Sequence, residues 1–133
     1  MIEVALQAAL SMRLSGSDLG VQGVHDIAPK VEDAANSSVF PYVVMGRIVL
    51  SQADTQTKVG HTAQIRIHTF SRTGGMLECK GIQGAIFSAL HRQTLTVSGH
   101  NNFSLLREDT DCWHEGDSKI HGVCEYRALI ESA

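Results

Sequence analysis

The residues best suited to chemistry lie near the end of the chain, in Cys112-x-His114 and His121-x-x-Cys124. Thiolate sulfur and imidazole nitrogen are ligands that zinc prefers. Strand alternation argues against one shared site. Cys112 and His114 fall on one face of a strand, whereas His121 and Cys124, three residues apart, fall on opposite faces. We therefore expect neither a metal nor a cofactor. A small metal-dependent enzyme built on these four residues remains the alternative from another functional class.

The seven histidines do not form a recognisable catalytic pattern. A general base needs a positioned partner and a substrate pocket, whereas His25 and Asp26 are loop neighbours and His68 falls on the polar face of a predicted strand. The sequence also lacks the nucleophile elbow, the H-E-x-x-H and C-x-x-C motifs and a glycine-rich phosphate loop. These observations predict that the protein is not an enzyme.

Two helices and two pairs of strands are expected to position these residues. Apolar side chains at helical spacing predict a first helix ending at Ser15-Gly16-Ser17 and a second ending near His91-Arg92. Their predicted buried stripes are Ile2, Ala5, Leu6, Ala9, Leu10 and Leu14, and Cys79, Ile82, Ile86 and Leu90.

Residues 40–50 and 63–72 predict two long strands joined by an exposed loop at 53–60. Strict alternation along the first strand places Val43, Met45 and Val49 on its outer face. Exposed apolar side chains of this kind commonly mark an interface, with ordinary scattered exposure as the alternative. The three residues are therefore candidate contacts between subunits.

A second hairpin is predicted from Phe103–His114 and Lys119–Ile130. The fold class is then α+β, a single antiparallel sheet of about four strands in two hairpins, with two helices packed on one face. Residues 17–39 form a long connection with one extended piece at Gly23–Ala28. Connections of this length are usually functional or ordered by a partner.

Length and charge limit the classes of function. The 133 residues fit a single domain, 1–133, and the net charge of −3 without a basic cluster argues against nucleic-acid binding. No apolar run is long enough to span a membrane, and the first residues do not resemble a signal peptide. Three cysteines without framework spacing indicate a reducing compartment, which we expect to be a cytoplasm.

The order of several short motifs resembles a known family over nearly the whole chain. The motifs are Phe40-Pro41-Tyr42-Val43-Val44-Met45-Gly46, Asp54-Thr55 with Lys58, His68-Thr69-Phe70-Ser71-Arg72 before Gly74-Gly75, and His121-Gly122-Val123-Cys124-Glu125-Tyr126-Arg127-Ala128-Leu129. This pattern resembles the tail terminator, or tail completion, proteins of long-tailed phages and gene transfer agents.

The resemblance implies a structural virion protein made in the cytoplasm of a host bacterium. Such a protein forms a homo-oligomeric ring, a hexamer, that caps the head-proximal end of the tail tube. The ring ends tube polymerisation and joins the tail to the neck and head. Its implied partners are the tail tube protein and a neck or stopper protein, with DNA only passing through the lumen. A neck stopper or head–tail adaptor is the alternative within this class.

Loop exposure predicts where the contacts lie, and the resemblance does not single these residues out. The first candidates are Asp54, Thr55, Gln56 and Lys58, in the loop between the two long strands. The second candidate is the long connection around Lys30 to Ser38.

Overall fold

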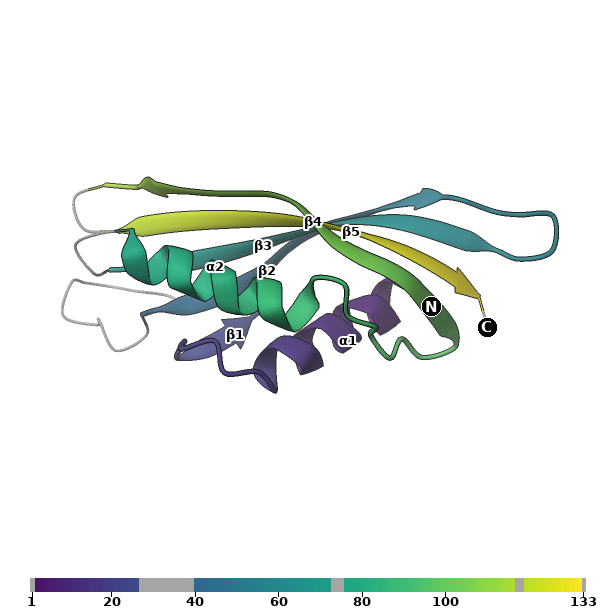
Figure 1. Cartoon of the computed structure of the whole chain (residues 1–133), viewed down its shortest axis with the longest axis horizontal. Helices are drawn as coiled ribbons and strands as arrows, with labels where there is room; N and C mark the ends of the chain where they lie inside the picture. The colour runs from purple at the N-terminus through teal and green to yellow at the C-terminus, as the bar shows by residue number, and fades with distance from the viewer. Residues whose placement is uncertain (1, 27–39, 73–75, 117–118, 133) are drawn as a thin grey trace.

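The computed structural model describes residues 2–26, 40–72, 76–116 and 119–132. Along the chain it has α1 (Ile2–Ser15), β1 (Gly23–His25), β2 (Tyr42–Gln52), β3 (Gly60–Ser71), α2 (Leu77–Leu90), β4 (His100–His114) and β5 (Ile120–Ser132). Both helices lie on one face of a strongly twisted sheet (Figure 1). The predicted α+β class and the position of the helices are confirmed.

The sheet differs from the prediction at one edge. Within the described ranges it has five strands in the order β1-β2-β3-β5-β4. β1 pairs parallel to β2, with Gly23 opposite Tyr42 and His25 opposite Val44, whereas the other pairs are antiparallel. The prediction of about four strands in a purely antiparallel sheet is therefore wrong. The extended piece predicted at Gly23–Ala28 contains the additional strand.

The core lies between the sheet and the helices, where most of the apolar stripes predicted for both helices are buried, with Ala5 and Ala9 partly buried. From α1 the buried stripe residues are Ile2, Leu6, Leu10 and Leu14, and from α2 they are Cys79, Ile82, Ile86 and Leu90. All of these except Cys79 belong to one cluster with the inward residues of β3 and β5, including Ile65, Ile67, Tyr126 and Ile130. Each fully buried aliphatic side chain contributes about 1.5–3 kcal/mol, so this layer stabilises the domain.

The outer face of β2 differs from the expectation because the strand contains a bulge. Its register against β3 shifts between Met45 and Ile48. A bulge adds one residue and exchanges the faces of the residues that follow it. Residues before the bulge therefore lie on the opposite face from the one that strict alternation with Ile48 and Leu50 predicts. Val43 and Met45 are buried in the core at 0% and 5% exposure, and their predicted exposure is wrong. Val49, beyond the bulge, is 38% exposed on the outer face, as predicted.

The segment Lys30 to Ser38 lies outside the described residues, so its predicted contacts stay a prediction. Within the described part of the chain, no helix has the length and apolar character needed to cross a bilayer.

Candidate assembly surfaces

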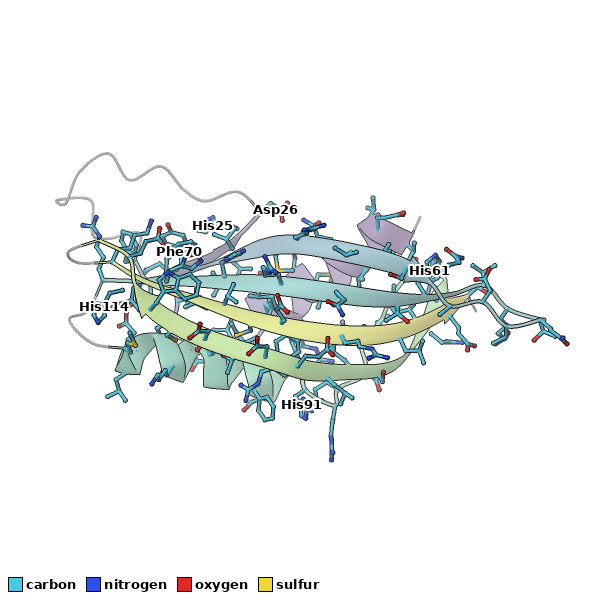
Figure 2. All side chains as sticks on the ribbon, turned by 90° about the horizontal axis from the view of Figure 1, so that it is seen from above. His25, Asp26, His61, Phe70, His91 and His114 are labelled. Atoms are coloured by element: carbon cyan, nitrogen blue, oxygen red, sulfur yellow. The ribbon has the colours of Figure 1, made fainter. Side chains whose placement is uncertain are left out.

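The β2–β3 hairpin projects beyond both helices as an arm, which we define as residues 50–62 (Figure 1). Pairing continues along the arm to Gln52 opposite His61, and the amide of Ala53 donates to the carbonyl of Gly60 at 2.8 Å. Figure 2 shows His61 toward the arm and Phe70 toward the opposite end of the sheet. The arm therefore extends the sheet away from the core.

The tip of the arm, residues 53–59, is held in a defined turn by its own side chains. Asp54 Oδ1 accepts hydrogen bonds from the Gly60 amide at 3.0 Å and from Gln52 Nε2 at 2.8 Å. These two bonds, the backbone bond first, lower the pKa of Asp54. The Thr55 amide donates to the Lys58 carbonyl at 2.9 Å, and Thr55 Oγ1 accepts from the Lys58 amide at 3.1 Å. A turn ordered in advance loses less entropy when it binds.

Four predicted contact residues meet at this tip. Asp54, Thr55, Gln56 and Lys58 are all exposed, and Val59 beside them is 50% exposed. Because Gln56 and Lys58 are exposed, both side chains are accessible to another protein. Their role as contacts stays a prediction.

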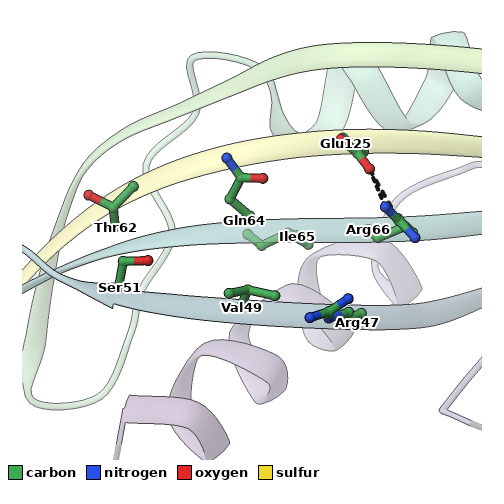
Figure 3. A pocket seen from close by; sticks show the side chains of 8 residues that line it. All are labelled: Arg47, Val49, Ser51, Thr62, Gln64, Ile65, Arg66 and Glu125. Carbon is green, nitrogen blue, oxygen red and sulfur yellow. Dashed lines mark hydrogen bonds and ion pairs between the residues drawn. The ribbon is translucent and has the colours of Figure 1, made fainter.

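A shallow groove of about 290 Å³ runs along the outer face at the base of the arm (Figure 3). Its residues come from β2, β3 and β5: Arg47, Val49, Ser51, Thr62, Gln64, Ile65, Arg66 and Glu125. Arg66 Nη2 lies 2.7 Å from Glu125 Oε1, an exposed ion pair that contributes at most about 1 kcal/mol. With Val49 at its floor, the groove is a mixed polar and apolar surface of the kind that protein contacts use.

A cluster of aromatic and imidazole rings covers the other end of the outer face. Phe40, Tyr42 and Val44 are buried there with Phe70 packed against them, apart from the main core. The His121 ring stacks on Phe70 with centroids 4.3 Å apart and contacts Trp113 at 4.5 Å. The cluster gives this end of the outer face many ring contacts, and none of the described helices covers it (Figure 2).

A hydrogen-bonded chain of ionisable groups runs through the cluster. His68 Nδ1 lies 2.8 Å from His121 Nε2, and His121 Nδ1 lies 2.6 Å from Glu115 Oε2. Partial burial lowers the pKa of His68, with His121 and Arg66 adding to the effect and Glu115 opposing it. These hydrogen bonds connect side chains of β3 and β5 to the turn between β4 and β5.

The four candidate zinc ligands do not come together. Cys112 faces α2, where its sulfur lies 3.2 Å from Cys79 Sγ, and Cys124 Sγ lies 3.7 Å from Thr110 Oγ1 in the core. His121 lies on the opposite face of the sheet, in the aromatic cluster. Among the described residues, no group of three or more histidine, cysteine or acidic side chains is arranged to hold a metal.

Sequence reasoning missed two groupings, the aromatic cluster and the approach of Cys112 to α2. Alternation places His68 and Phe70 on the outer face of β3 and His121 on the outer face of β5. Their contact depends on the register that sets Phe70 opposite His121. That register follows from pairing between strands about fifty residues apart, which a single sequence does not display.

Comparison with known proteins identifies the family. The family model described as tail completion protein gp17 matches residues 4–131. A chain from the virion of a native gene transfer agent particle has the same fold, with a TM-score of 0.84 and 21% identity over 98% of both chains. Another solved structure aligns with a TM-score of 0.49 and 11% identity, over 99% of this chain and 93% of the other. A search of curated protein sequences finds no match. Since the family model spans nearly all of the sequence, the chain belongs to the tail completion protein gp17 family, which are structural proteins of virion tails rather than enzymes.

Proposed function

We propose that this protein forms a ring of six copies that caps the head-proximal end of the tail tube. The ring ends tube polymerisation and joins the tail to the neck. Membership of the tail completion family and the fold shared with a gene transfer agent virion chain support this assignment. The observation that carries it is the arm, an ordered hairpin that leaves the domain with an exposed tip (Figure 1).

The arm suits a ring because cyclic assembly uses two different patches on each subunit. In a head-to-tail ring, each copy donates one surface and receives its neighbour on another. The tip around Gln56 and Lys58 is the donated surface, and the groove at Arg47 and Val49 is available on the outer face. The tip also suits the tail tube protein, so the arm's partner is either the next subunit or the tube.

Termination in this proposal is a matter of binding rather than chemistry. One face of the ring complements the open end of the tube, and the opposite face complements a neck or stopper protein but not another tube subunit. DNA only passes through the lumen. The net charge of −3 supports this point because a surface of that sign does not hold DNA by its phosphates.

Tail length measured in particles that lack the protein tests the proposal. Deletion of the gene is expected to give tubes longer than normal that carry no heads, and expression of the intact protein in the same strain should restore length. Normal-length tails separated from leaking heads would instead favour the neck stopper or adaptor. Tails of normal length on filled heads would refute both assignments.

A further inference from the structure

Two cysteines from different elements meet between α2 and the edge strand β4. Cys112 Sγ on β4 lies 3.2 Å from Cys79 Sγ in the first turn of α2. A disulfide bond is about 2.05 Å long, so the two sulfurs lie about 1 Å beyond bonding distance. Both residues are free thiols in the structure.

The surroundings are built around this pair. Cys112 pairs across the strands with Gly122, and a Cβ atom at Gly122 would lie 2.5 Å from Cys79 Sγ. Glycine at this position therefore leaves the space that the Cys79 sulfur occupies. Gln83, one turn along α2, has its Oε1 atom 2.9 Å from Cys112 Sγ and donates from Nε2 to the Asp111 carbonyl at 2.8 Å. These contacts hold the Cys112 side chain toward α2.

The two thiols differ in access to solvent. Cys79 is fully buried, and burial, with Cys112 beside it, raises the pKa of its thiol. Cys112 is partly exposed and lines an open pocket of about 350 Å³ together with Lys80 and Arg107. A small reagent therefore reaches Cys112 before Cys79.

We propose that Cys112 and Cys79 form an oxidation site that a low-molecular-weight disulfide converts into an intrachain disulfide bond. The Cys112 thiolate attacks one sulfur of the reagent, forms a mixed disulfide and expels one thiolate, which takes up a proton from water. Cys79 then loses its proton to solvent, and its sulfur attacks Cys112 Sγ and expels the second thiolate. The cysteine pair loses two electrons, and the reagent is reduced to two thiols.

The bridge fits the passage of a virion protein between two environments. Thiols stay reduced in a cytoplasm, whereas disulfides form and persist outside the cell. The bond would tie α2 covalently to β4, the strand at one edge of the sheet order. The site follows from the geometry of the single chain and remains valid if the ring proposal fails.

Glutathione disulfide on the purified, folded protein is the probe. Free thiols are counted by maleimide labelling in denaturant after the reaction is quenched with acid. The native protein should fall from three labels to one, while unoxidised protein keeps all three. Cys124→Ser is the matched control and should fall from two labels to none. Cys112→Ser should keep both of its thiols, since neither remaining sulfur is exposed.

Peptide mapping then identifies the bond. Trypsin places each cysteine in a separate peptide by cleaving after Arg72, Lys80, Arg107, Lys119 and Arg127. The expected product joins the Cys79 and Cys112 peptides within one chain and disappears on reduction. Three labels retained after oxidation, a stable mixed disulfide alone, or a bond to Cys124 or between chains would each overturn the proposal. Because the native protein carries the main test, misfolding of a variant cannot produce these results.

Discussion

Replacement of Gly122 by alanine tests the contact between α2 and β5. A Cβ atom there would lie 2.5 Å from Cys79 Sγ and 2.7 Å from Gln83 Nε2. Gly-to-Ala changes in regular structure usually stabilise by about 0.5–1 kcal/mol because they restrict the unfolded chain. At Gly122 the crowding makes the same change destabilising.

The magnitude follows from the two crowded atoms. Overpacking a core costs about 1–3 kcal/mol. Displacement of the buried Gln83 amide from the Asp111 carbonyl leaves a polar group unsatisfied, at about 1–3 kcal/mol. After the usual Gly-to-Ala gain is subtracted, Gly122→Ala should lose about 1–5 kcal/mol of the about 5–15 kcal/mol typical of a domain. For a domain of this size the fall in Tm is roughly 10 °C.

Urea and thermal unfolding of purified protein measure the effect under reducing conditions. Gly81→Ala is the matched control, because Gly81 is exposed in the same helix and an added Cβ meets nothing within 4 Å. That variant should gain about 0.5–1 kcal/mol from helix propensity. The same glycine-to-alanine change is thus predicted to lower the free energy of unfolding at Gly122 and to raise it at Gly81.

A variant that combines Gly122→Ala with Cys79→Ala tests whether the Cys79 sulfur causes the destabilisation. Cys79→Ala removes the sulfur that the new methyl group meets, so the combined change should cost at least about 1 kcal/mol less than the sum of the single changes. Stability of Gly122→Ala equal to that of the native protein, or additive effects with Cys79→Ala, would refute the close approach of α2 to β5.

Three further changes test the arm in assembly, the buried hydroxyl of Tyr126 and the partly buried imidazole of His68. Replacing residues 54–59 with Asn-Gly, a two-residue hairpin turn, should leave Tm within a few degrees but reduce the yield of completed particles at least tenfold. The control Lys80→Glu on α2 should preserve both Tm and particle yield. A normal particle yield from the shortened arm would exclude the tip as an assembly contact. The Tyr126 hydroxyl is buried without a hydrogen-bond partner among the described residues, so Tyr126→Phe should keep or raise stability by about 1 kcal/mol in urea unfolding; a clear loss would reveal a partner. Because the folded pKa of His68 is lowered, the unfolded chain binds its proton first, and stability should fall as pH drops through about 6.5. In urea unfolding at a series of pH values, His68→Asn should weaken the dependence of stability on pH near 6.5. An unchanged dependence would contradict the reasoning.

The regular parts of the fold could be predicted because their burial follows a single period. On β3, Ile65 and Ile67 alternate with exposed Gln64 and Arg66, and the structure keeps that order from Ala63 to Ser71. Both helices likewise bury the stripes that their spacing indicates. In these elements apolar residues recur in the sequence at the same spacing at which the backbone returns side chains to one face.

The strand β2 was predicted, but its faces were assigned wrongly because the period changes within the strand. Its inward residues are Val43 and Met45, then Ile48 and Leu50, so one step of three interrupts the steps of two. The interruption spans Gly46, and a glycine inside a strand often marks a bulge. The sequence therefore carries the signal, but strict alternation read through Gly46 reverses the faces and misplaces Val43 and Met45.

The candidate surfaces were only partly predictable for a different reason. The polar tip at Asp54 and Lys58 could be predicted because it depends only on neighbouring residues, which are of turn-forming types. The aromatic cluster and the thiol pair depend on alignment between distant elements, as in the contact of Cys79 with Cys112. Such contacts follow from strand register and helix placement, which a single sequence does not contain.

The division between core and arm makes assembly experimentally separable from folding. Stability resides in the layer between helices and sheet, whereas the tip residues Asp54 to Val59 are exposed and absent from that core. An isolated two-stranded hairpin is only marginally stable in water. The arm keeps its shape because it continues long strands anchored in the core and because Asp54 closes its turn. Changes at the exposed tip are therefore expected to spare the core, so an effect on particles would report binding rather than unfolding.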